Sequence, residues 1–280
     1  MNYIITGQDG MIGYFLKKEL DKNNKCILKI DQRSGYNILN LEALRLNPLT
    51  QQTDILLHTA AQNKINEAIE YPVLPHINNC NGTFQVLEFC RKNKISKIVN
   101  FSSSRVLSPE ENPYTASKKY GENLTKAYHD CYGLEYITVR PSTVYGPCHD
   151  ITSRLITSWC QNALNNEEIK IFGDKNKTLD FTYVSDFVDA IILLINNWEK
   201  TKNKSFNISG EQETNLYWLA RYIKWKTNSK SEIKFYPQEI AQPQQVKVNI
   251  NDLKSYGYKP KINIQEGVNL LLDFYKHERY

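Results

Sequence analysis

Short apolar runs of strand length alternate with longer amphipathic stretches through the first half of this 280-residue chain. The apolar runs predict strands at 3–6, 26–30, 55–59, 97–102 and 136–140, and the stretches between them predict helices at 12–23, 41–46, 75–93 and 113–132. Strands that are joined by helices run parallel, because each crossover returns the chain to the same end of the sheet. The alternation therefore predicts an α/β fold with a doubly wound parallel sheet of the Rossmann type.

The regular alternation of predicted strands and helices ends at about residue 145, and beyond it glycines and prolines separate shorter elements. Such punctuation is typical of a second, irregular lobe. We expect a Rossmann domain over residues 1–145 and a smaller C-terminal lobe over residues 146–280, with some elements of the lobe returning to the first domain.

Composition excludes several classes of protein. Hydrophobic residues make up 41% and charged residues 23% of the chain, as in globular proteins. The net charge of +5 comes from scattered basic residues, so nucleic acid is not an expected partner. No apolar run has the length of a membrane span, and the chain enters a strand at once without a basic leader. We expect a soluble, cytoplasmic protein with no membrane partner.

The six cysteines include no C-x-x-C pair, and their spacing matches no zinc or disulfide framework. The histidines show no metal-ligand spacing either. We expect reduced thiols and no metal.

A glycine triplet, Gly7, Gly10 and Gly13, follows the first predicted strand directly. The first glycine permits a tight turn, the second lets the backbone approach a pyrophosphate, and the third allows close helix packing. Asp31 ends the second predicted strand, 24 residues after Gly7, where a carboxylate accepts both ribose hydroxyls of NAD. The combination predicts a dinucleotide site that prefers NAD, because Asp31 repels a 2′-phosphate, although Arg33 partly offsets that repulsion.

Tyr114 and Lys118 are four residues apart and so share one helix face. The same spacing occurs twice more, in Tyr14/Lys18 and Tyr222/Lys226. Only Tyr114 follows a buried-strand pattern that ends in serines, 11 residues after Ser103. Ligands bind at the carboxyl ends of parallel strands, and a neighbouring ammonium lowers the pKa of a phenol. The three residues predict proton transfer to and from a sugar hydroxyl beside a nicotinamide.

With these residues the chain resembles the extended short-chain dehydrogenases/reductases of the NAD-dependent epimerase/dehydratase family, over at least residues 1–210. The matching motifs include Thr6-Gly-Gln-Asp-Gly-Met-Ile-Gly13, Asp31, Asn37-Ile38, His58-Thr-Ala-Ala61, Asn79-Cys-Asn-Gly-Thr83, Tyr114-x-x-x-Lys118 and Arg140-Pro-Ser-Thr-Val-Tyr-Gly-Pro147. The resemblance implies that residues 1–145 bind NAD and that the C-terminal lobe binds substrate. It also implies a homodimer, formed by the helices at about 81–92 and 113–132.

The same resemblance implies roles for individual residues. Ser103 becomes the catalytic serine, Tyr114 the acid/base, and Lys118 the residue that holds the ribose and the phenolate. The implied cofactor contacts, besides the three glycines, Asp31, Tyr114 and Lys118, are Met11, Ile12, Asn37, Ile38, Ala60, Ala61, Asn79, Arg140 and Pro141. The implied substrate contacts are Ser103, Ser104, Arg105 and Thr143, with Arg154 and Lys177 as candidate phosphate partners.

Departures from the family pattern narrow the function. Ser104 and Arg105 stand where family dehydratases carry an acidic pair, which argues against a 4,6-dehydratase. Thr143 and Leu179 stand where relatives that hold a nucleoside diphosphate usually have Asn and Arg, and Gln242 lies near a further usual Arg. Fewer guanidinium contacts predict weaker or different anchoring of a diphosphate.

The leading hypothesis is an NAD-dependent epimerase of a nucleotide-activated sugar, which oxidises a hydroxyl of the sugar to a transient ketone and reduces it again on the other face. One alternative is an NAD(P)H-dependent keto-sugar reductase, which requires added reduced cofactor. The other is a non-catalytic regulatory member that only binds the dinucleotide, although such proteins usually lose the Tyr or the Lys.

Overall fold

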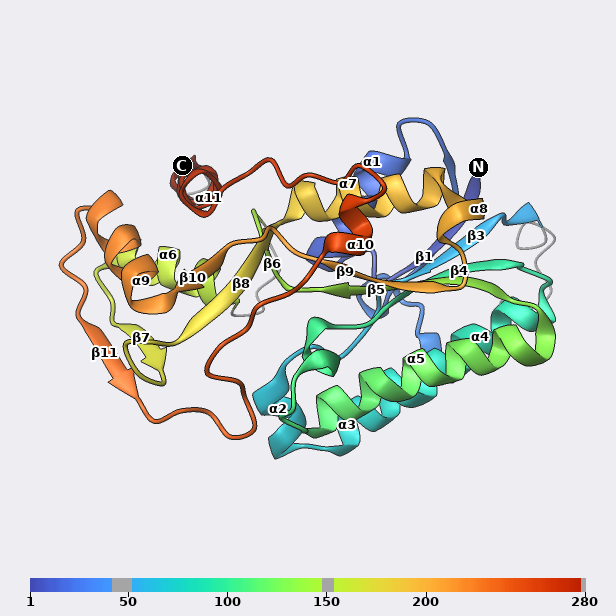
Figure 1. The fold of residues 1–280 in the computed structure, drawn as a ribbon, viewed down its shortest axis with the longest axis horizontal. Helices are drawn as coiled ribbons and strands as arrows, with labels where there is room; N and C mark the ends of the chain where they lie inside the picture. Colours follow the sequence, from blue (N-terminus) through green and yellow to red (C-terminus); the bar gives the residue numbers. More distant parts are fainter. Residues whose placement is uncertain (42–51, 148–153, 278–280) are drawn as a thin grey trace. The chain divides into compact units, whose positions relative to one another are not determined.

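The computed structural model describes residues 1–41, 52–147 and 154–277. Its central sheet has six strands in the order β2-β1-β3-β4-β5-β9 (Figure 1). These strands are β1 (Asn2–Thr6), β2 (Lys25–Ile30), β3 (Ile55–His58), β4 (Lys97–Phe101), β5 (Glu135–Pro141) and β9 (Lys204–Ile208). The four pairings among the first five strands are parallel. The α/β fold and the five strands expected from the sequence are confirmed.

The strand order reverses at β1, which has β2 on one side and β3 on the other. Side chains of β1 and β3 are buried on both faces of the sheet, as Ile4, Ile5 and Leu56 illustrate. This double burial explains why the strands appear in the sequence as continuous apolar runs. A reversal of strand order opens a crevice at the carboxyl ends of the strands, so Thr6 and His58 mark the place where a ligand binds in such a sheet.

Helices cover both faces of this sheet, with α4 and α5 side by side on one face and α1 and α7 on the other (Figure 1). The helices of this part of the chain are α1 (Met11–Leu20), α2 (Ile65–Glu70), α3 (Val73–Pro75), α4 (Gly82–Lys92), α5 (Pro113–Tyr132), α7 (Val184–Asn196) and α8 (Trp198–Thr201). The helix expected at 75–93 divides into α3, a π-helical turn (His76–Asn81) and α4. The helix expected at 41–46 lies outside the described residues, apart from Leu41.

The chain forms two compact units, one of Met1–Pro141 with Val188–Asn207 and the other of Ser142–Phe187 with Ile208–Tyr280. The second unit contains a sheet of β10 (Glu213–Asn215), β8 (Thr178–Tyr183) and β6 (Thr143–Tyr145), and a parallel pair of β11 (Ile233–Tyr236) and β7 (Ile169–Phe172). Its helices are α6 (Leu155–Asn165), α9 (Leu216–Lys226), α10 (Asn251–Lys254) and α11 (Ile264–His277).

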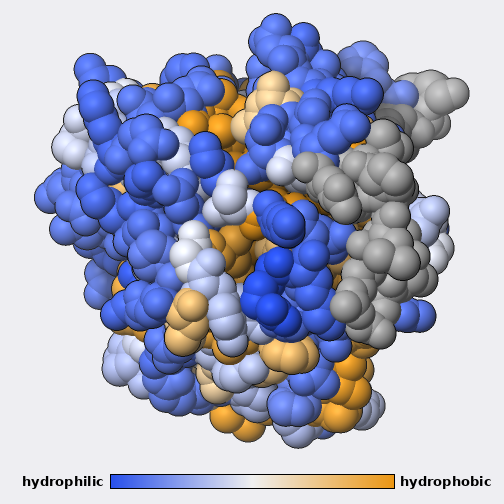
Figure 2. All heavy atoms as spheres, turned by 90° about the vertical axis from the view of Figure 1, so that its right-hand side faces the viewer, coloured by the Kyte–Doolittle hydropathy of each residue, from blue (hydrophilic) through white to orange (hydrophobic). Residues whose placement is uncertain are grey.

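Hydrophilic residues cover most of the face shown in Figure 2, and hydrophobic residues appear between them and along the lower edge. Large hydrophobic side chains that are exposed on α4 and α5 include Phe84, Tyr120 and Tyr132. In the described part of the chain, no helix is both long and apolar enough to cross a membrane. Within the same residues no group of His, Cys, Asp and Glu side chains is arranged to hold a metal ion, and the five described cysteines are free.

Candidate active site

The glycine triplet forms the turn between β1 and α1. Gly7 has a φ of +73°, and a Cβ there would lie 2.7 Å from the backbone nitrogen of Ala60. A Cβ on Gly13 would lie 2.7 Å from Cα of Gln8 and closer still to the carbonyl oxygen of Gly7. The fold itself therefore requires these two glycines.

Gly10 differs, because the protein does not crowd it. A Cβ there would lie 3.4 Å from the nearest atom, the carbonyl oxygen of Gly7. Gly10 is also the N-cap of α1, where no side chain caps the helix and the first turn carries no acidic residue. A helix N-terminus attracts phosphate oxygens through its free N–H groups, and Gly10 lets them approach. Met11 and Ile12 supply the next backbone N–H groups, so this turn fits the diphosphate of a dinucleotide.

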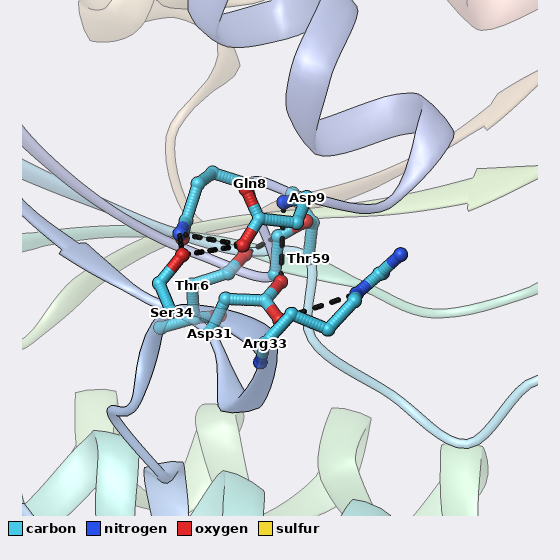
Figure 3. Close-up of polar contacts among 8 residues, drawn as sticks. Thr6, Gln8, Asp9, Asp31, Arg33, Ser34 and Thr59 are labelled. Atoms are coloured by element: carbon cyan, nitrogen blue, oxygen red, sulfur yellow. Dashed lines mark hydrogen bonds and ion pairs between the residues drawn. The ribbon is translucent and has the colours of Figure 1, made fainter. Parts of the chain in front are cut away.

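Asp31 lies directly after β2, and its carboxylate is held in place by the backbone (Figure 3). It accepts hydrogen bonds from the N–H groups of Arg33 at 3.0 Å and Asp9 at 3.1 Å, and it forms an ion pair with the Arg33 guanidinium at 3.5 Å. Beside Asp31, the side chains of Gln8, Asp9 and Ser34 hydrogen-bond to one another, and these three residues were not identified from the sequence as functional. Ser34 donates to the Asp9 carboxylate at 2.6 Å. A fixed carboxylate at the end of β2 suits the ribose hydroxyls of NAD.

Tyr114 and Lys118 lie in the first two turns of α5. Asn112 begins this helix by accepting a hydrogen bond from the N–H of Thr115 at 2.9 Å, and Tyr114 is buried. The Lys118 ammonium donates to the carbonyl oxygen of Phe101, the last residue of β4, at 2.9 Å. Helix α5 thus holds its lysine at the carboxyl end of β4, where the sequence predicted chemistry.

Ser103 follows β4 by two residues and is buried. Its hydroxyl accepts a hydrogen bond from the N–H of Arg105 at 3.2 Å and so begins a 3-10 helix, Ser104–Leu107. Ser104 is also buried in the first position of this turn. The predicted serine and the predicted lysine are therefore both anchored at the end of one strand.

The electrostatic environment of Lys118 is set chiefly by burial, which lowers the pKa of its ammonium to about 8, while the nearby Glu122 and Cys80 raise it. Lys118 is thus mostly protonated at neutral pH. His58 at the end of β3 lies between the hydroxyls of Thr6, 2.9 Å away, and Thr83, 3.2 Å away. Burial, and then the Lys118 charge, lower the pKa of His58 to about 3. The imidazole of His58 is therefore neutral at neutral pH and adds no positive charge beside Lys118.

Four further predicted cofactor residues of the first unit lie on the connections that follow β2 and β3. Ala60 donates its N–H to the Thr6 hydroxyl at 3.2 Å. Ala61 follows it on the same connection. Asn37 caps a 3-10 turn through its side chain, and Ile38 packs into the core.

Asn79 connects two segments rather than facing outward. Its side-chain oxygen accepts from the N–H of Gln62 at 2.8 Å, and its amide nitrogen donates to the Gln62 carbonyl at 3.0 Å and to the Ser117 hydroxyl at 2.8 Å. These bonds tie the chain after β3 to the helix that carries Tyr114.

Arg140 lies near the end of β5, just before Pro141, and its guanidinium makes a two-bond contact with Glu122 of α5. The distances are 2.8 Å from Nε to Oε1 and 2.5 Å from Nη2 to Oε2. The structure pairs Arg140 with a carboxylate one helical turn beyond Lys118, and the cofactor contact that the resemblance implied for Arg140 stays a prediction. Glu122 was not identified from the sequence, although its place four residues after Lys118 was a signal available there.

The second unit contains the remaining candidate substrate residues. Thr143 begins β6. Lys177 is buried, and its ammonium donates to the Phe172 carbonyl at 2.6 Å and lies 3.9 Å from the Glu239 carboxylate. Arg154 is the N-cap residue of α6, and its buried Nε has no hydrogen-bond partner among the residues that the structure describes. Lys177 thus stabilises its own unit, and Arg154 retains a donor.

Residues 3–209, well over half of the chain, match the model of the NAD dependent epimerase/dehydratase family. The chain belongs to this family. It is 30% identical, over 98% of both chains, to a protein of Methanocaldococcus jannaschii named as a putative UDP-glucose 4-epimerase. It is 26% identical to the UDP-glucuronate 4-epimerase of Thermodesulfobacterium geofontis, over 98% of this chain and 96% of that one.

The fold of this family member also matches solved structures along its whole length. The crystal structure of the UDP-glucose 4-epimerase of Thermotoga maritima with UDP-glucose superposes with a TM-score of 0.91 at 23% identity and covers 100% of each chain. The predicted family, fold class and NAD dependence are therefore confirmed, and the protein is an NAD-dependent enzyme of the short-chain dehydrogenase/reductase superfamily.

Proposed function

We propose that this family member is an NAD-dependent epimerase that acts on a nucleotide-activated sugar. The observation that carries the proposal is the placement of Tyr114 and Lys118 one turn apart on α5, with the lysine bonded to the last carbonyl of β4 and Ser103 two residues further on. The relatives named as 4-epimerases of UDP sugars support it. The glycine turn and Asp31 would hold the diphosphate and the ribose of NAD.

The chain's own residues supply the proton chemistry. Tyr114 acts as a phenolate, which the Lys118 ammonium, protonated at neutral pH, stabilises. It removes the proton of a sugar hydroxyl, is a neutral phenol while the ketone exists, and later returns the proton. Ser103 donates a hydrogen bond to the reacting oxygen as charge develops on it. Bound NAD supplies a hydride acceptor that becomes the hydride donor. Return of the hydride to the opposite face of the transient ketone would invert that carbon, and because proton and hydride both return to the sugar, the reaction is redox-neutral and consumes no cofactor.

The anchoring of the nucleotide is expected to differ from that of most relatives. Leu179 is buried in β8 at the position where a diphosphate-binding Arg is usual. We assign the phosphate contact to Arg154, whose Nε lacks a partner within the described residues, rather than to Lys177, which is engaged with Phe172 and Glu239. An arginine binds phosphate oxygens with two parallel bonds.

A homodimer is part of this proposal. Helices α4 and α5 lie side by side, since the Tyr128 hydroxyl donates to the Glu88 carboxylate at 2.7 Å, and they expose Phe84 and Tyr120. Exposed aromatic side chains on two adjacent helices suit a two-fold, four-helix contact. Light scattering at micromolar concentration tests this, and a monomer would contradict it. A cytoplasmic location stays a prediction.

Turnover of nucleotide sugars tests the function directly. Purified protein is incubated with UDP-, dTDP-, GDP- and CDP-sugars, and proton NMR follows conversion to the epimer with and without added NAD. We expect epimerisation of at least one nucleotide sugar, and loss of it in Tyr114→Phe. Reduction of a nucleotide-linked keto-sugar with stoichiometric consumption of added NADH, without epimerisation, would instead establish a reductase. No turnover of any sugar by protein that binds NAD would overturn the proposal.

The same assay tests the proposed phosphate contact of Arg154. Arg154→Ala is expected to raise KM with little effect on kcat, since it removes a phosphate contact and none of the groups that transfer the proton. Arg221→Ala, on the exposed side of α9, is the control and should leave KM unchanged. An unchanged KM in Arg154→Ala would show that another group holds the phosphates.

A further inference from the structure

Helix α5 carries three ionisable groups along one face, because Tyr114, Lys118 and Glu122 are each four residues apart. Glu122 is largely buried, with 14% of its side chain exposed. A carboxylate and an ammonium one helical turn apart normally attract each other into an ion pair. The Lys118 ammonium nevertheless donates to the Phe101 carbonyl, 2.9 Å away.

The contacts of Arg140 explain why Lys118 bonds to the Phe101 carbonyl and not to Glu122. From β5 it contacts both carboxylate oxygens of Glu122, at 2.8 and 2.5 Å, and 23% of its own side chain is exposed. A two-bond arginine–carboxylate contact is among the stronger pairs in proteins and holds both groups in one plane. Both oxygens of Glu122 are therefore engaged on the side of β5, while Lys118 is engaged with β4.

We propose that Glu122 and Arg140 are positioning residues for the active site: Arg140 holds the Glu122 carboxylate, so that Lys118 stays bonded to Phe101 at the strand end, beside Tyr114, instead of turning back along α5. This inference rests on the proposed function for its catalytic meaning, but the arrangement itself belongs to the protein without substrate or cofactor.

The charged groups that face Lys118 make the proposal measurable. From β3 it meets the neutral His58, from the π-helical turn the Cys80 thiol, and from its own helix Glu122. Burial lowers the pKa of Lys118 to about 8, and Glu122 opposes that effect even while it is paired with Arg140. Freeing Glu122 should therefore raise the pKa of Lys118, and removing Glu122 should lower it.

Titration of cofactor-free protein labelled with [ε-¹³C]lysine reads this pKa by NMR, with Lys118→Arg assigning the resonance. Arg140→Gln is expected to shift the midpoint up, and Glu122→Gln to shift it down, each by about one pH unit, which is the order of shift that a single neighbouring charge produces. In the Glu122→Gln background, Arg140→Gln should shift the midpoint by less than half as much, because Arg140 acts mainly through Glu122.

The chain offers a matched control in α4, where Arg91 makes the same two-bond contact with Glu88, at 2.8 and 2.9 Å. Arg91→Gln should leave the Lys118 midpoint unchanged. If Arg140→Gln fails to fold, Arg140→Lys keeps the charge, loses the two-bond contact, and is expected to shift the midpoint up by a smaller amount. Glu122→Gln provides an independent measurement, because it is expected to lower the Lys118 midpoint where the Arg140 variants raise it.

Unchanged midpoints in both single variants, or shifts of the same sign, would overturn the proposal and leave the pair a purely structural contact. Once a substrate is known, the alkaline limb of kcat/KM should move in the direction of the NMR midpoint for each variant. The NMR shifts without turnover of any sugar would instead count against the proposed function alone, so failure of the two ideas is distinguishable.

Discussion

Alanine substitution of three glycines separates what the fold requires from what the cofactor requires. In Gly13→Ala the new methyl group would meet only backbone atoms of Gly7 and Gln8, at distances under 3.0 Å. Backbone cannot swing aside, so the β1–α1 turn must move. Forced overpacking of this kind costs about 1–3 kcal/mol, occasionally more. With a melting temperature that falls by about 2–4 °C per kcal/mol in a chain of this size, Gly13→Ala should melt about 6–12 °C lower if the cost is at the upper value.

Gly10→Ala should behave differently, because its nearest neighbours would lie 3.4 and 3.7 Å away, at ordinary contact distances. Replacing an N-cap glycine by alanine costs about 1 kcal/mol, so the melting temperature should fall by only about 2–4 °C. The methyl group would nevertheless occupy the approach of a diphosphate to α1. We expect NAD affinity to fall at least about tenfold, which corresponds to about 1.4 kcal/mol.

Gly121→Ala in the middle of α5 is the control. A Cβ there would lie 3.6 Å from the Thr83 hydroxyl, and alanine in a helix interior is favoured over glycine by about 0.5–1 kcal/mol. This variant should be at least as stable as the wild type and should bind NAD normally. Thermal denaturation and calorimetry with NAD measure all three proteins. Wild-type NAD affinity in Gly10→Ala would refute the assignment of the diphosphate to this turn, and wild-type stability in Gly13→Ala would refute the crowding argument.

Three further outcomes are expected. Tyr114→Phe should lower turnover by about 10²- to 10⁴-fold with little change in NAD affinity by calorimetry; Tyr14→Phe, at an exposed position with the same Tyr–Lys spacing, is the control, and a near-normal rate in Tyr114→Phe would contradict the mechanism. NAD should bind more tightly than NADP, and Asp31→Ser should reduce the ratio of the two affinities. Equal affinities in the wild type would mean that Arg33 offsets the repulsion of a 2′-phosphate by Asp31. Because the pKa of His58 is lowered to about 3 in the folded protein, the unfolded chain takes up a proton first as pH falls from 6.5, so stability should decrease towards pH 4 by up to about 1.4 kcal/mol per unit. His58→Gln should flatten that decrease in denaturant titrations.

Several features of the protein were determined by its sequence because their causes are local. The period of burial along the chain predicts the five strands and α5, since a strand buried on both faces must be apolar throughout. The glycine triplet predicts the β1–α1 turn, since a φ of +73° at Gly7 and the close approach at Gly13 exclude other side chains. The four-residue spacing of Tyr114 and Lys118 predicts a shared helix face.

Two kinds of feature could not be predicted from the sequence: a change of helix type, and the contacts of a side chain with other elements. The π-helical turn and α4, which meet at residues 81 and 82, were expected as one helix, because a change in helix type leaves the hydrophobic period nearly unaltered. Lys177 and Arg154 were equivalent candidates in the sequence. Only packing distinguished a buried lysine bonded to a carbonyl from an arginine whose Nε has no partner among the residues that the structure describes.

Only the tertiary structure decided what surrounds Lys118. Glu122 and Arg140 are 18 residues apart in the chain and meet because α5 packs against the sheet with its Lys118 face towards β4 and β5. Residue spacing determines which side chains share a face of one element, but the order of the strands determines which elements are neighbours. A pairing between elements therefore has no local signature, and for this reason the contact between Arg140 and Glu122 was not expected from the sequence.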